Sequence, residues 1–128
     1  MKMSIRELLA DAASRGAAYL EGLPSRSVAP SAHAVIALRD LDLALPEHPI
    51  DPSAILRLLD EVGSPATVAT AGGRYFGFVI GGSLPAALAA NVLAGAWDQP
   101  AGLVIASPAT AAIETIALRW LLAALSLP

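Results

Sequence analysis

An uncharged run of 23 residues, 75–97, constrains this chain more than any other feature. A run of that length is long enough to cross a bilayer or to form a fully buried element of a protein core. It is not uniform, because Gly81-Gly82-Ser83 and Pro85 place turn-forming residues near its middle. We therefore expect a short apolar stretch over 75–80, a glycine turn, and a helix from about residue 84 to 97. The expected N-cap of that helix is Ser83.

A second apolar segment begins at Ser107-Pro108, a helix cap followed by proline at the first helical position. We expect this helix to run to about Leu125. Its apolar residues form two faces, one of Ile113, Ile116, Trp120 and Leu121 and another of Leu118, Leu122 and Leu125. A helix that is apolar nearly all round is normally buried. Nothing else in the chain is left to bury its second face.

The first part of the chain has the pattern of two amphipathic helices. Ser4 and Glu7 have the spacing of a capping box, and Gly22 and Pro24 are expected to end the helix that follows. Its apolar stripe consists of Ile5, Leu8, Leu9, Ala12, Gly16, Tyr19 and Leu20. The charged residues fall mostly outside this stripe; they are Arg6, Asp11, Arg15 and Glu21. The helix is therefore expected to pack through the stripe and expose its charges.

Residues 23–52 contain five of the ten prolines, which predicts extended chain with one short helical piece near 35–43. Asp51 is expected to cap a second helix, with Pro52 in its first turn. Its buried face is predicted to consist of Ile55, Leu56, Leu59 and Val62. No series of strand patterns is present, so the predicted fold class is mostly α.

Composition excludes several classes of function. The net charge is −3 without a basic cluster, which removes the electrostatic signature of a nucleic-acid-binding protein. The absence of cysteine excludes a disulfide scaffold and a thiolate zinc site. His33 and His48 make no plausible metal pair, so no metal site is expected. The N-terminus carries Glu7 and Asp11 and lacks the apolar core of a secretory signal, so we expect a cytoplasmic protein.

Several motifs resemble the pyridoxal-phosphate-dependent group II decarboxylases, which include aromatic amino acid and glutamate decarboxylases. The similarity is carried by the segment from Arg74 to Pro85, RYFGFVIGGSLP, and continues in register over nearly the whole chain. The further matching segments are Leu45-Pro46-Glu47, Asp51-Pro52, Ala96-Trp97-Asp98-Gln99, Ser107-Pro108, Ile113-Glu114, Arg119-Trp120-Leu121 and Leu127-Pro128. Their order and spacing make a chance match unlikely.

The resemblance implies the N-terminal part of a fold-type I enzyme, cut off at the start of its large α/β domain. Residues 1–73 would be a helical segment that wraps around the partner subunit of a homodimer. Residues 74–128 would be a turn at the edge of the active site and the first helices leading into the cofactor domain. The family's reaction, decarboxylation of an amino acid substrate, would belong to the full-length protein in the cytoplasm.

The same resemblance places no catalytic residue in this chain. The family's cofactor-binding lysine and the histidine and aspartate that hold the cofactor ring would lie beyond residue 128. The only lysine present, Lys2, precedes the first helix and has no pocket to lower its pKa. Pyridoxal phosphate needs a lysine amine to form its Schiff base. We therefore expect this chain alone to be inactive and not to hold the cofactor stably.

The site residues that the resemblance carries over are few. Phe78, Gly81, Gly82 and Ser83 are expected to shape the substrate pocket. Ser107 and Thr110 are expected at the edge of the cofactor domain. Without the resemblance, these residues predict only a glycine turn and ordinary helix caps.

Two other classes of function are compatible with the apolar pattern. A small two-span membrane protein would use residues 75–97 as its first span, and the uncharged residues 99–113 with those that follow as its second. Gly81-Gly82-Ser83 and Pro85 interrupt the first span, and Glu114 and Arg119 would fall within the second. A non-catalytic helical interaction module would use its exposed apolar faces to hold a partner.

Overall fold

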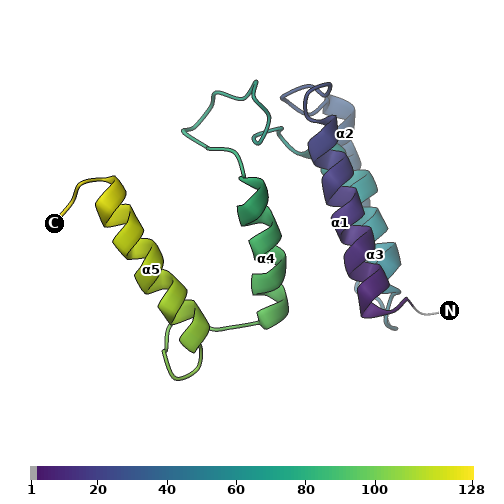
Figure 1. Cartoon of the computed structure of the whole chain (residues 1–128). Helices are drawn as coiled ribbons and strands as arrows, with labels where there is room; N and C mark the ends of the chain where they lie inside the picture. Colours follow the sequence, from purple (N-terminus) through teal and green to yellow (C-terminus); the bar gives the residue numbers. More distant parts are fainter. Residues whose placement is uncertain (1–2) are drawn as a thin grey trace. The chain divides into compact units, whose positions relative to one another are not determined.

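The computed structural model describes residues 3–128, and it is built from helices without strands in that range (Figure 1). Helices account for 58% of the described residues, which confirms the predicted mostly α architecture. The chain divides into two compact units, unit 1 (Met1–Gly82) and unit 2 (Ser83–Pro128). The expected division at residues 73 and 74 stays a prediction.

Helix α1 (Ile5–Gly22) begins with the predicted capping box. The backbone N–H of Glu7 donates to the Ser4 hydroxyl over 3.3 Å, and the backbone N–H of Ser4 donates to the Glu7 carboxylate over 2.7 Å. The backbone N–H of Ser4, and then its hydroxyl, lower the pKa of Glu7 below its ordinary value. The helix ends at Gly22, as predicted.

The face that α1 turns towards the rest of unit 1 differs from the predicted stripe. Ile5 is 71% exposed and Leu9 48% exposed, although both were expected to pack. Asp11 and Arg15, which were expected mostly outside the packed face, are half-buried. The reason is an ion pair between helices: Arg15 Nη1 lies 2.9 Å from Asp60 Oδ2 and Arg15 Nε lies 3.1 Å from Asp11 Oδ1. Charge pairing, which hydrophobic periodicity does not detect, turns this face inwards.

Two short helices follow along the proline-rich segment. Helix α2 (Ala32–Ala37) is capped by Ser31, whose hydroxyl accepts from the Ala34 N–H over 3.1 Å. It continues as the 3-10 turn η1 (Leu38–Leu41). Together they correspond to the short helical piece expected near residues 35–43.

Helix α3 (Pro52–Leu58) lies beside α1 (Figure 1). Asp51 caps it as predicted, accepting from the Ser53 N–H over 3.0 Å. It runs into a wide turn with π-helical hydrogen bonds, η2 (Leu59–Gly63), and a 3-10 turn, η3 (Ser64–Ala66). A π turn holds more residues than an α turn, so the regular spacing does not persist through η2. The predicted buried face is not buried: Leu56 and Val62 are half-buried, and Ile55 and Leu59 are 37% and 53% exposed.

The apolar core of unit 1 is small. Among the described residues, only Leu23, Ala34 and Ala69 are buried hydrophobic residues. A backbone hydrogen bond of 2.9 Å, from the Ala69 N–H to the Val28 carbonyl, ties two distant parts of the unit together. Polar contacts between segments therefore carry much of the organisation of this unit.

Unit 2 contains helices α4 (Pro85–Trp97) and α5 (Pro108–Ala124). Their large apolar side chains are exposed, including Val92 at 55%, Trp97 at 50% and Trp120 at 69%. Large apolar side chains on both predicted helices are thus exposed.

Candidate functional site

The segment from Arg74 to Ile80 is the most conformationally unusual part of the chain. Phe78 and Val79 have φ angles of 54° and 55°, in the left-handed region, and their side chains are 91% and 105% exposed. The turn was expected at Gly81-Gly82, yet no described glycine has a positive φ. A left-handed backbone at a residue with a Cβ costs roughly 1–2 kcal/mol. Exposed and strained residues of this kind concentrate at functional segments.

The start of this segment is anchored to the end of α1. Arg74 Nη2 donates to the backbone carbonyl of Leu23 over 3.4 Å and also to that of Arg26. The Tyr75 ring folds over Gly77, where an added Cβ would lie 2.9 Å from the Tyr75 hydroxyl oxygen. The segment therefore leaves a fixed anchor and ends in exposed apolar residues.

The predicted pocket residues fall on both sides of the division between the units. Phe78, Gly81 and Gly82 are in unit 1, and Ser83 is the first residue of unit 2. The expectation that Ser83 caps α4 is wrong: Leu84 occupies the N-cap position, with no side-chain hydrogen bond. Pro85 takes the first helical position and places Ser83 one residue too far from the helix to cap it.

Ser107 and Thr110 lie at the start of α5, as predicted. Ser107 occupies the N-cap position, but its hydroxyl makes no capping hydrogen bond because its backbone ψ is 69° rather than extended. The side chain is buried, with 1% of the residue exposed and no hydrogen-bond partner for Oγ. Thr110 is half-buried one turn into the helix. The ordinary capping role expected for Ser107 is therefore not performed.

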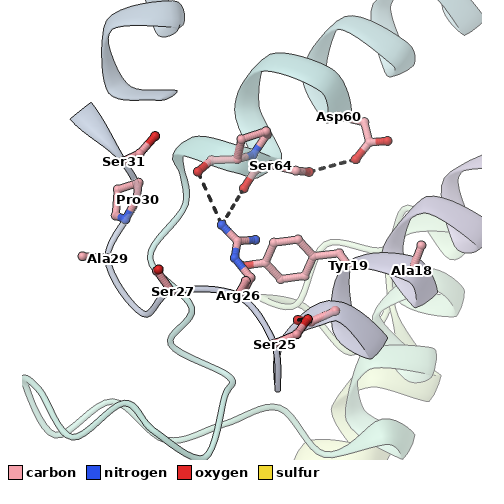
Figure 2. A pocket seen from close by; sticks show the side chains of 12 residues that line it. Ala18, Tyr19, Ser25, Arg26, Ser27, Ala29, Pro30, Ser31, Asp60 and Ser64 are labelled. Carbon is pink, nitrogen blue, oxygen red and sulfur yellow. Dashed lines mark hydrogen bonds between the residues drawn. The ribbon is translucent and has the colours of Figure 1, made fainter. Parts of the chain in front are cut away.

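A pocket of about 580 Å³ in unit 1 is a second candidate site (Figure 2). Arg26 Nη2 donates to the backbone carbonyls of Ser64, Pro65 and Thr67 over 3.1, 3.4 and 3.1 Å. The guanidinium carbon lies 4.9 Å from the centroid of the Tyr19 ring. The hydroxyl groups of Tyr19 and Thr67 are 2.8 Å apart and hydrogen-bonded. These contacts hold the positive charge of Arg26 in one place.

Asp60 is the acidic residue of this pocket, and its charge is already compensated. A hydrogen bond from Arg15 and a second from the Ser64 hydroxyl, 2.9 Å long, lower the pKa of Asp60. The hydrogen bond to Asp60, followed by that to Asp11, raises the pKa of Arg15. The sequence patterns do not predict this pocket. The one feature that points to it is Arg26 between Ser25 and Ser27, directly after the first helix.

The described residues do not fit pyridoxal phosphate. The Schiff base of this cofactor needs a lysine amine, and residues 3–128 contain no lysine. Lys2 lies outside the described residues. Within residues 3–128, no group of three or more acidic, histidine or cysteine side chains is placed to hold a metal ion. No helix in that range has the length and apolar character to cross a membrane.

The ion pairs of the described chain are those of Arg15, and Glu114 and Arg119 on α5 form none with each other. The end of α4 is exposed, with Asp98 in the left-handed conformation and Gln99 donating to the Trp97 carbonyl over 2.9 Å.

Comparison of the chain with protein-family models, with curated proteins and with solved structures finds no match.

Proposed function

We propose that this chain is the N-terminal part of a pyridoxal-phosphate-dependent amino acid decarboxylase of fold type I. Its role there is to supply contacts between subunits and part of the substrate pocket. The observation that carries the proposal is the uncovered apolar surface of α4 and α5, on the helices that bear the AWDQ and RWL segments of the resemblance. Apolar faces of this size occur where a helix is buried by another part of an assembly.

In this proposal the segment around Phe78 is one wall of the substrate pocket. The exposed Phe78 side chain and its left-handed backbone support this role, because strained backbone conformations concentrate at functional sites. Gly81, Gly82 and Ser83 continue the wall, and Ser107 and Thr110 lie at the edge of the cofactor domain. The cofactor itself would be held by residues that follow this chain in the full-length enzyme.

The experiment is complementation in trans. A bacterial group II decarboxylase would be shortened by removing the part that matches this chain, and the remainder would be co-expressed with residues 1–128. We expect the two pieces to co-purify and to release carbon dioxide from the amino acid that the shortened enzyme normally uses. Trp120→Asp places a charge on the exposed face of α5 and is expected to abolish both results. Glu21→Gln, an exposed change on α1, is the matched control and is expected to retain both.

The proposal fails if the wild-type pieces neither co-purify nor restore activity under conditions in which the shortened enzyme stays soluble. Co-purification without activity favours a second candidate, a helical interaction module that has no catalytic role. The same exposed faces of α4 and α5 support that candidate, since apolar patches of this kind mark interaction sites.

A further inference from the structure

The pocket beside Tyr19 is an open hollow on unit 1 that the proposed decarboxylase function does not use. Its volume, about 580 Å³, is within the range of small-molecule sites. All of its lining residues belong to unit 1. Its polar groups determine which ligand it accepts.

The pocket is lined by one cation, Arg26, and one carboxylate, Asp60. Asp60 is paired with Arg15, which Asp11 shares, and with Ser64, whereas Arg26 has no ion-pair partner in the described structure. In the described structure Arg26 uses only Nη2 for hydrogen bonds, so Nε and Nη1 keep their N–H groups for a further acceptor. Because Tyr19 and three carbonyls already fix the guanidinium, a ligand binds it without having to order a mobile side chain.

Hydroxyl donors supplement the guanidinium. The Ser31 hydroxyl accepts from the Ala34 N–H and keeps its own proton to donate, and the Ser27 hydroxyl makes no hydrogen bond within the described chain. Figure 2 shows Ser27, Pro30 and Ser31 on one chain segment and Arg26 with Tyr19 beside it. Apolar groups complete the lining, namely Ala18, Ala29, Pro30 and Pro65.

These groups match a singly charged anion with a short hydrocarbon body. The Arg26 cation and the hydroxyl donors would bind its charged end, and the apolar lining would contact the hydrocarbon. We propose that this pocket binds a small organic carboxylate. Inorganic phosphate fits less well, because it carries more charge than the single Arg26 balances and has no apolar part.

Saturation-transfer NMR on the full chain tests this proposal, because it observes the ligand whatever the assembly state of the protein. Butyrate is the probe, and we expect saturable binding with a dissociation constant of about 1 mM. Butyramide, its uncharged analogue, is expected to bind at least tenfold more weakly. Ser27→Ala is expected to weaken butyrate binding about fivefold, the loss of one hydrogen bond. Ser14→Ala, a matched change on the exposed part of α1, is expected to leave it unchanged.

Arg26→Met is expected to abolish binding, and circular dichroism identifies a variant that has merely unfolded. The proposal is overturned if butyrate shows no saturable signal at 50 mM, a concentration about fifty times the expected dissociation constant. Equal binding of butyramide or of inorganic phosphate also overturns it, as does a Ser27→Ala variant that binds like Ser14→Ala.

Discussion

Replacement of Arg26 by methionine removes three hydrogen bonds and a cation–π contact from unit 1. Methionine keeps an unbranched apolar side chain but lacks the guanidinium. The change therefore removes the donor to the carbonyls of Ser64, Pro65 and Thr67 and the cation above the Tyr19 ring. These groups join the end of α1 to the turn after α3, so the loss weakens a junction that then depends on the Tyr19–Thr67 hydrogen bond and the Arg15–Asp60 ion pair.

The size of the effect follows from the contacts. Hydrogen bonds from a charged group contribute about 1.5–3 kcal/mol, and the open pocket places this set near the lower limit. The cation–π contact adds about 0.5–1 kcal/mol. Together they amount to about 2 kcal/mol. With a urea dependence of about 1 kcal/mol per molar for a unit of this size, the midpoint of unfolding is expected to fall by about 2 M.

The tyrosine ring resonances follow this transition selectively, because Tyr19 and Tyr75 are in unit 1 and both tryptophans are in unit 2. Arg26→Lys is expected to recover less than half of the loss, since an ammonium group cannot match the planar contact with the ring. Arg6→Met, an exposed change on α1, controls for the loss of charge. If the urea midpoint of Arg26→Met lies within about 0.3 M of the wild-type midpoint, the proposed role of Arg26 in joining the two segments is refuted.

Four further predictions concern other parts of the chain. Hydrogen bonds from Arg15 and then from Ser64 lower the pKa of Asp60 in the folded chain. The ionised carboxylate therefore stabilises the fold above its ordinary pKa of 3.8, and this contribution is lost as the pH falls through the lowered pKa of the folded state. The urea midpoints of Asp60→Asn and the wild type should therefore differ at pH 7 and converge at acidic pH. Val79→Gly is expected to leave the free energy of unfolding unchanged or to raise it by up to about 1 kcal/mol, because glycine accepts the left-handed conformation. A clear fall in the melting temperature would contradict the left-handed backbone at this position. Addition of pyridoxal phosphate is expected to give no saturable, stoichiometric absorption band, since residues 3–128 contain no lysine; a stoichiometric band would show a binding site. Light scattering in lipid-free buffer is expected to find the wild type associated and Trp120→Asp less so, whereas a monodisperse wild-type monomer would mean that the apolar faces are covered within the chain.

Local signals predicted the helices of this chain well. The capping box at Ser4 and Glu7, the Asp51 cap with Pro52, and the ends at Gly22 and Trp97 depend on neighbouring residues alone, and the structure confirms them. Packing faces were predicted less well because they depend on partners distant in sequence. Arg15 turns inwards to reach Asp60, which lies 45 residues away, and the π turn at η2 breaks the spacing expected for Leu59.

The candidate site illustrates the same limit. Glycines suggested where the turn before α4 would be, but the left-handed positions fall on Phe78 and Val79, which no local rule favours. The Ser107-Pro108 pair correctly predicts a helix start, yet the backbone angle that keeps its hydroxyl from capping is set by the preceding loop. The Arg26 pocket joins residues from α1 to η3 and was not predicted, because its contacts appear only when these segments come together.

The coding sequence downstream of codon 128 tests the central claim most directly. The proposed decarboxylase origin predicts that this DNA encodes, in frame or after a frameshift, a cofactor domain with a lysine directly preceded by a histidine. Unrelated coding sequence at that position in a complete clone would contradict the claim.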